Sequence, residues 1–161
     1  MEVSDAIANR RSIRKYTGEE VSDNDIKAVL EAGRWGPSGL NNQPWKFKVL
    51  KGKVKDSIAE HTRYGHIIEA APACIAVFLD VENSYNRDKD LQAIGACIQN
   101  MLLRIQSLGL GAVWLGEILN QREKVEETLG VEHELMAVIA LGHPGEEGSS
   151  DRKDMGELLL E

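Results

Sequence analysis

Apolar and polar positions in the first half of the chain follow the periods of alternating helices and strands. The spacing predicts a short helix over residues 3–9, capped by Ser4. A longer helix is predicted to open at Ser22, because apolar residues follow there at i, i+3 and i+4. Apolar side chains alternate with lysines over residues 45–49, which is the period of a half-buried strand. Residues 53–62 are predicted to form a surface helix.

The second half of the chain carries the most apolar segments. Residues 74–79 form a continuous apolar run, which indicates a central strand covered on both faces. The longest predicted helix spans residues 89–108, and much of its first half consists of small residues. A strand over 112–115, a helix that ends at Gly130 and a buried strand over 135–141 follow. About four strands between helices indicate an α+β fold, and no repeat or linker divides the chain, which is read as a single domain.

Composition limits the class of protein. The 161 residues are 42% hydrophobic, which is enough for one sizeable core. The net charge of −7 at pH 7 argues against non-specific nucleic-acid binding, since a phosphate backbone needs a basic surface. No segment approaches the roughly 18 apolar residues of a membrane span and no signal-peptide pattern is present, so a cytoplasmic protein is expected. Cys74 and Cys97 are expected to be buried free thiols, and the histidine spacing predicts no metal site.

The segment from Trp35 to Trp45 is the most distinctive stretch of the chain. It holds two Trp, two Pro, two Gly and four uncharged polar residues. Proline restricts φ and glycine permits positive φ, so the backbone shape is strongly specified. Its amide and hydroxyl groups offer directed donors and acceptors without charge, which suits a flat neutral heterocycle. The same composition is also typical of a helix end followed by a surface turn.

Three arginines and a serine lie close together at Arg10, Arg11, Ser12 and Arg14. Arginine binds phosphate oxygens bidentately and serine adds a hydroxyl donor, so this cluster predicts a local anion site for a single phosphate monoester. A solvated basic turn is the alternative. The glycines of residues 109–116 do not match a dinucleotide fingerprint and no Walker sequence is present, so neither of those folds accounts for a bound phosphate.

In their order and spacing, the chain's motifs closely resemble those of the nitroreductase-like flavoprotein family, along nearly the whole chain. The segments that carry the resemblance are Arg10–Arg14, Gly36–Trp45, Ala71–Pro72, Gln99–Leu103, Gly109–Gly111, Trp114–Gly116, Leu141–Pro144 and Arg152–Lys153. The resemblance implies a three-layer sandwich with a central mixed, mostly antiparallel sheet of about four strands. It also implies an intertwined homodimer that holds FMN at the subunit interface.

The resemblance further implies which residues contact the cofactor. The arginines and Ser12 are expected at the phosphate and ribityl chain, and the Pro37–Ser38 turn is expected to come from the other subunit. A backbone N–H near Gly116 or Glu117 is expected to point at flavin N5. No side chain is expected to be catalytic, because the flavin carries the chemistry. The residues expected to bind FMN are Arg10, Arg11, Ser12, Arg14, Pro37, Ser38, Asn41, Gln43, Leu115, Gly116, Arg152 and Lys153.

The activity that the resemblance implies is that of an NAD(P)H-dependent FMN oxidoreductase. It would pass electrons in a ping-pong cycle from NAD(P)H, through flavin N5, to an electron-poor acceptor such as a nitroaromatic or a quinone. Residues 52–71 form a shorter segment than in most relatives, which leaves a non-catalytic FMN store or redox sensor as an alternative. A dehalogenase-like or flavin-cleaving enzyme of the same fold, and a phosphate-binding module without flavin, are further alternatives. The sequence does not choose between NADH and NADPH.

Overall fold

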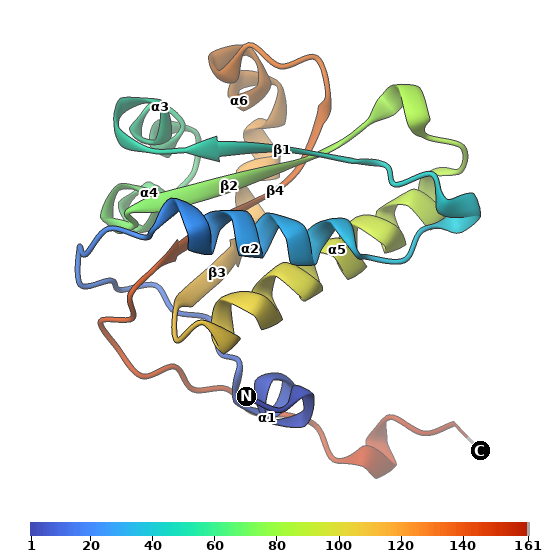
Figure 1. Cartoon of the computed structure of the whole chain (residues 1–161). Helices are drawn as coiled ribbons and strands as arrows, with labels where there is room; N and C mark the ends of the chain where they lie inside the picture. The colour runs from blue at the N-terminus through green and yellow to red at the C-terminus, as the bar shows by residue number, and fades with distance from the viewer. Residues whose placement is uncertain (161) are drawn as a thin grey trace.

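The computed structural model of the protein describes residues 1–160 and contains a four-stranded sheet between two layers of helices (Figure 1). The strand order is β1-β2-β4-β3, and every neighbouring pair is antiparallel. A parallel bridge joins Ser12 to Ala112, beside β3. The predicted three-layer α+β sandwich with a mostly antiparallel sheet is therefore confirmed. The strands are β1 (Trp45–Leu50), β2 (Ala73–Leu79), β3 (Gly111–Leu115) and β4 (Glu134–Gly142).

Helices α2 and α5 cover one face of the sheet, and α3, α4 and α6 cover the other (Figure 1). The α-helices are α1 (Val3–Asn9), α2 (Asp23–Arg34), α3 (Gly52–Asp56), α4 (Gly65–Ala70), α5 (Arg87–Ser107) and α6 (Arg122–Leu129). Short 3-10 helices lie between these elements: η1 (Gly39–Asn41), η2 (Ala59–His61), η3 (Val81–Asn83) and η4 (Glu117–Gln121). Another, η5 (Met155–Glu157), lies in the C-terminal segment after β4. Among the described residues, no helix combines the length and apolar character needed to cross a membrane.

Strand β2 separates two hydrophobic cores. Ile75 and Val77 point into the core beneath α2 and α5, whereas Ala76 and Phe78 point into the core beneath α4 and α6. Every residue of β2 is buried, because side chains alternate between two covered faces. The prediction of a central strand is therefore confirmed.

Helix α5 is the longest element, and its 21 residues span roughly 30 Å. Its buried stripe, which includes Ile94, Ile98 and Ile105, packs on the sheet and on α2. Gly33 of α2 permits this close approach, because a Cβ there would lie 2.7 Å from Met101 Cγ. The two ends of α5 are therefore far apart and rigidly connected.

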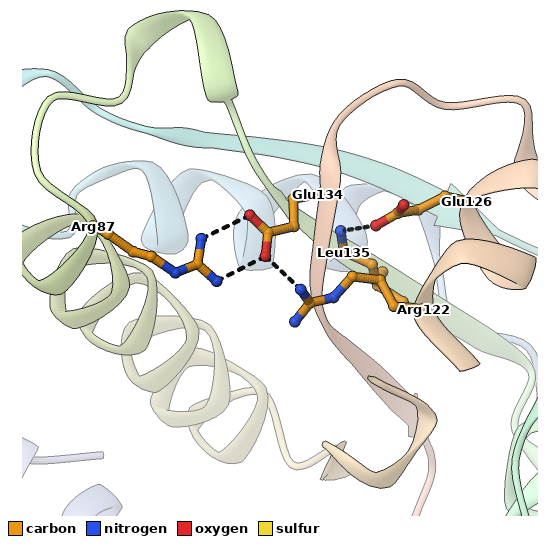
Figure 2. Close-up of polar contacts among 5 residues, drawn as sticks. All are labelled: Arg87, Arg122, Glu126, Glu134 and Leu135. Atoms are coloured by element: carbon orange, nitrogen blue, oxygen red, sulfur yellow. Dashed lines mark hydrogen bonds and ion pairs between the residues drawn. The ribbon is translucent and has the colours of Figure 1, made fainter. Parts of the chain in front are cut away.

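An ion-pair cluster fixes the start of β4 to the helices on both sides (Figure 2). Glu134 accepts hydrogen bonds from Arg87 at 2.9 and 2.8 Å, and Arg122 pairs with the same carboxylate. The next backbone N–H, of Leu135, donates to the Glu126 carboxylate at 2.6 Å. Charges from α5 and α6 thus converge on one strand end.

Two local predictions are wrong. Residues 53–62 do not form one helix: α3 ends at Asp56, a 3-10 turn follows, and α4 is an additional helix. The reason is that Lys55 is buried and its Nζ donates to the carbonyl of Ile68 at 2.6 Å, which turns this segment toward α4. Ser4 lies inside α1 rather than at its cap, which is Glu2.

Both cysteines are buried free thiols, as predicted. Burial raises the pKa of Cys74 and of Cys97 to about 12. A thiol with such a pKa carries very little thiolate near neutral pH, and the thiolate is the nucleophilic form. Both side chains therefore act as small apolar core residues.

Candidate functional site

The arginine-rich segment after α1 runs alongside the edge of β3. Ser12 pairs with Ala112 in a parallel bridge, and the Ile13 N–H donates to the Ala112 carbonyl at 2.9 Å. Side chains of an extended segment alternate between two sides. Arg10, Ser12 and Arg14 consequently share one side, in a row roughly 13 Å long at about 3.3 Å per residue.

Arg11 points to the other side of the same segment. Its Nη1 donates to the Ala8 carbonyl at 2.7 Å and to the Arg10 carbonyl at 2.9 Å, which ties it to the end of α1. Ile13, on the same side as Arg11, is buried against Gly111. The structure thus separates Arg11 from the other three candidates of this segment.

Positive charge gathers at the Arg10 end of this row, where Arg152 of the C-terminal segment approaches. Burial lowers the pKa of Arg10, and the nearby charges of Arg152 and Arg11 lower it further. Within residues 1–160, no carboxylate forms an ion pair with Arg10, Arg14 or Arg152. Uncompensated arginines that repel one another are stabilised by a bound anion with several oxygens, such as a phosphate. Lys153 follows Arg152 and is exposed.

The Arg14 end of the row opens onto a cavity of about 220 Å³. Strand β3 ends there, so Leu115 and Gly116 contribute to the wall beside the exposed ring of Trp114. Tyr64 closes the cavity from α4's side of the sheet. The row therefore leads from clustered positive charge at one end to a partly apolar cavity at the other.

Glu117 also lines this cavity, and its carboxylate is held by residues 62 and 63. Thr62 Oγ1 donates to it at 2.5 Å and Arg63 Nε donates at 3.1 Å. The hydrogen bond from Thr62 holds the pKa of Glu117 below its ordinary value. An ionised carboxylate with these partners is poorly suited to proton transfer near neutral pH.

The turn between α2 and β1 is strained. Leu40, Asn41 and Gln43 adopt φ values of 55°, 54° and 49°, a region that residues other than glycine rarely occupy. Ser38 Oγ accepts a hydrogen bond from the Gln43 N–H at 3.0 Å, which closes the turn. Pro37 is exposed. Strain of this kind concentrates at functional sites.

The turn and the arginine row lie near opposite ends of α5. Pro37 and Ser38 border a cavity beside Gln92, whereas Arg11 and Ile13 border one beside Gln106. Fourteen residues of helix separate these two glutamines, which corresponds to roughly 21 Å. The structure therefore brings Arg10, Ser12, Arg14, Leu115, Gly116 and Arg152 into one region, and keeps Pro37, Ser38, Asn41 and Gln43 in another.

Similarity to known proteins assigns the chain to a family. The model described as the Nitroreductase family matches residues 7–65 and 62–143. The chain belongs to the nitroreductase family. A relative from Methanothermobacter thermautotrophicus carries the name NADH dehydrogenase/NAD(P)H nitroreductase. It is 36% identical over 167 aligned residues, and the match covers 100% of this chain and 87% of that protein.

Solved structures agree with this assignment. A crystal structure from Desulfovibrio desulfuricans, described as a nitroreductase in complex with FMN, has a TM-score of 0.98 and 52% identity, and the match covers 100% of this chain and 96% of that chain. Among relatives known by sequence, a protein of Thermus thermophilus named NADH dehydrogenase is 26% identical, and the match covers 99% of this chain and 96% of that protein. The resemblance expected from the order of the motifs is thus confirmed.

Sequence reasoning missed several residues that border the site of this nitroreductase-family chain. Tyr64 and Trp114 line the cavity with Leu115, and Thr62 and Arg63 hold Glu117. Trp114 belongs to the Trp114–Gly116 motif, which was the signal in the sequence, whereas its exposure in an otherwise buried strand is seen only in the structure. Thr62 and Arg63 carry no such signal, because they reach Glu117 only through the tertiary fold.

Proposed function

We propose that this protein is an FMN-dependent oxidoreductase that passes electrons from NADH or NADPH to an electron-poor acceptor such as a nitroaromatic or a quinone. The observation that carries the proposal is the uncompensated Arg10–Arg152 charge at one end of a row that leads to the cavity at Leu115 and Gly116. The relative from Desulfovibrio desulfuricans, which is described in complex with FMN, supports it.

The residues of this row suit the parts of FMN in order. Arg10 and Arg152 would hold the phosphate, with Lys153 beside them, because FMN carries a phosphate monoester at one end. Ser12 offers a hydroxyl in the middle of the row, where the ribityl chain would lie. The cavity wall of Leu115 and Gly116 offers an apolar strand end to the ring. The donor set therefore fits the cofactor.

The second half of the proposed site comes from another copy of the chain. The turn that carries Pro37, Ser38, Asn41 and Gln43 lies roughly 21 Å along α5 from the arginine row, too far to complete the same site. The C-terminal tail also favours a partner: it runs past α1 and away from the sheet (Figure 1), and Leu159 and Leu160 are 67% and 99% exposed. We therefore propose a homodimer with FMN at its interface.

FMN, when bound, supplies the redox chemistry, since its ring can take up a hydride equivalent from a nicotinamide and release electrons to an acceptor. The chain's own residues bind and orient. Arg14 places positive charge at the ring end of the row, which stabilises negative charge added there. A backbone N–H near Gly116 or Glu117 would donate to the ring. No side chain is proposed as a catalytic acid or base, because the Glu117 carboxylate is ionised and occupied.

The proposed cycle is ping-pong, with both substrates using one cavity in turn. We also propose a cytoplasmic location, which the two free thiols support, since thiols stay reduced in that compartment. A flavin store or redox sensor is the outcome to be distinguished from an enzyme, because the segment over residues 52–71 is expected to be shorter than in most relatives.

Anaerobic titration of the FMN-reconstituted protein tests the proposal. NADH or NADPH is expected to bleach the visible flavin spectrum, and nitrofurazone or menadione is expected to restore it. Bleaching without reoxidation by any acceptor would favour the sensor, and no bleaching with either nicotinamide would favour the store. A protein that stays colourless after reconstitution would refute the proposal.

A further inference from the structure

Asp90, in the first turn of α5, is a fully buried carboxylate outside the proposed cofactor site. Its Oδ2 accepts hydrogen bonds from Ser84 Oγ at 2.7 Å, from the Tyr85 N–H at 3.0 Å and from the Asn86 N–H at 3.1 Å. Its Oδ1 accepts from Asn42 Nδ2 at 2.7 Å. A buried charge is tolerated only when such donors replace water.

Asn42 connects this carboxylate to the strained turn. Its Nδ2 also donates to the Asn83 carbonyl at 2.9 Å, so both amide hydrogens are committed. Its Oδ1 is buried and has no hydrogen-bond partner within residues 1–160. Asn42 lies between Asn41 and Gln43, two of the residues with positive φ. The Asn42 side chain thus ties the middle of the turn to Asp90 and to the loop that precedes α5.

Tyr85 provides a second connection from Asp90 to the turn. Its backbone N–H is fixed by the Asp90 carboxylate, and its side chain packs on Gly39 at the start of η1. The contact is so close that a Cβ on Gly39 would lie 1.8 Å from the Tyr85 hydroxyl oxygen. Asp90 therefore holds both the beginning and the middle of the turn.

We propose that Asp90 is a positioning residue for flavin binding. Through Asn42 and Tyr85 its carboxylate fixes the turn in the strained shape that presents Pro37 and Ser38 to the FMN of the neighbouring subunit, so the inference rests on the proposed function. Positive φ at non-glycine residues persists only where surrounding contacts enforce it. A carboxylate is required because it only accepts hydrogen bonds, and four donors face it; an asparagine would direct an N–H at another donor.

Two matched variants test the proposal. Asn42→Ala removes the side-chain link from Asp90 to the middle of the turn and leaves the Ser84, Tyr85 and Asn86 donors on Asp90. Ser84→Ala removes one Asp90 hydrogen bond of the same length, 2.7 Å, and leaves the turn untouched. Both variants lose one hydrogen bond to the buried Asp90 carboxylate, and Asn42→Ala also loses its bond to the Asn83 carbonyl, so both are expected to lower the melting temperature, Asn42→Ala somewhat further. A merely structural role would change the melting temperature in both variants without a selective change in flavin affinity.

The readouts are hydrogen exchange of residues 38–44 in the flavin-free protein and the Kd for FMN, measured by quenching of flavin fluorescence. Asn42→Ala is expected to speed exchange in the turn and to raise the Kd by about tenfold, the scale of one hydrogen bond to a charged group. Ser84→Ala is expected to change neither. Asp90→Asn, if it folds, is expected to match Asn42→Ala or exceed it.

The outcomes distinguish a failure of the role given to Asp90 from a failure of the proposed function. Equal Kd values for Asn42→Ala and Ser84→Ala, with FMN bound by the wild type, would overturn the role of Asp90 and leave the proposed function standing. Turn exchange unchanged in Asn42→Ala would also overturn it. A wild-type protein that takes up no FMN would overturn the proposed function, and the flavin role of Asp90 with it.

Discussion

Replacement of Arg10 by glutamine separates a ligand-binding role from a structural one. Burial and the charges of Arg152 and Arg11 lower the pKa of Arg10, so the folded flavin-free protein disfavours its positive charge. Removal of that charge relieves repulsion, and the melting temperature of flavin-free Arg10→Gln is expected to equal or exceed that of the wild type. A residue kept for stability would show the opposite sign.

The effect on FMN affinity follows from the contact that is lost. A hydrogen bond to a charged group contributes about 1.5–3 kcal/mol, so the Kd for FMN is expected to rise roughly 10- to 150-fold in Arg10→Gln. Fluorescence quenching of FMN measures the Kd, and tryptophan fluorescence with and without FMN measures the melting temperature. The stabilisation that FMN gives to the variant is expected to shrink accordingly.

Arg11→Gln is the matched control, because Arg11 has the same charge and lies on the opposite side of the segment. It loses its hydrogen bonds to the carbonyls of Ala8 and Arg10, so its free energy of unfolding without FMN is expected to fall by about 0.5–1.5 kcal/mol. Its Kd for FMN is expected to stay within about twofold of the wild type. Equal losses of affinity in the two variants would refute the assignment of the row.

Two further predictions concern stability and assembly. Glu134→Gln is expected to lower the free energy of unfolding at pH 7 by about 1–3 kcal/mol, since the carboxylate loses its charge-assisted bonds to two arginines. The hydrogen bond from Arg87 holds the pKa of folded Glu134 below its ordinary value of about 4.3. The stabilisation by the Glu134 carboxylate is therefore present above its ordinary pKa and is lost as the pH falls through the lowered pKa of the folded protein. Urea unfolding measures this, and a difference in unfolding free energy between wild type and Glu134→Gln that persisted below both pKa values would contradict it. Ending the chain after Lys153 removes the exposed leucines of the C-terminal tail. Burial of each leucine would contribute about 1.5–3 kcal/mol, so the truncation is expected to weaken the dimer more than about tenfold. Unchanged light scattering at low protein concentration would contradict this expectation.

The sequence predicted elements whose signals are local. Ser22 caps α2 as expected, accepting a hydrogen bond from the Asp25 N–H at 3.0 Å, because a cap needs only neighbouring residues. The apolar period of α5 and the continuous apolar run of β2 also depend only on local pattern and general burial. Family membership followed from motifs that are individually weak but stand in a distinctive order.

Other features depend on contacts between distant segments, and the sequence did not show them. Residues 53–62 have a helical composition, but the predicted helix is interrupted where the Lys55 ammonium donates a hydrogen bond to the Ile68 carbonyl of α4. Arg10 and Arg11 are adjacent in sequence, and only pairing with β3 places them on opposite sides. Asp90 reads as an ordinary first-turn acid of α5 until the fold brings Asn42 against it.

In the proposed homodimer, the arginine row of one chain and the turn of the other form each FMN site. A heterodimer of an Arg10→Gln chain and a Gly39→Ala chain tests it most directly, since the added Cβ would meet Tyr85 and disturb the turn. If the site is shared, one site of this heterodimer receives both defects and the other receives none. FMN titration of the purified heterodimer is then expected to show one site of wild-type affinity per dimer. Two equally weakened sites and none of wild-type affinity would mean that each chain builds its own site, and would contradict the account.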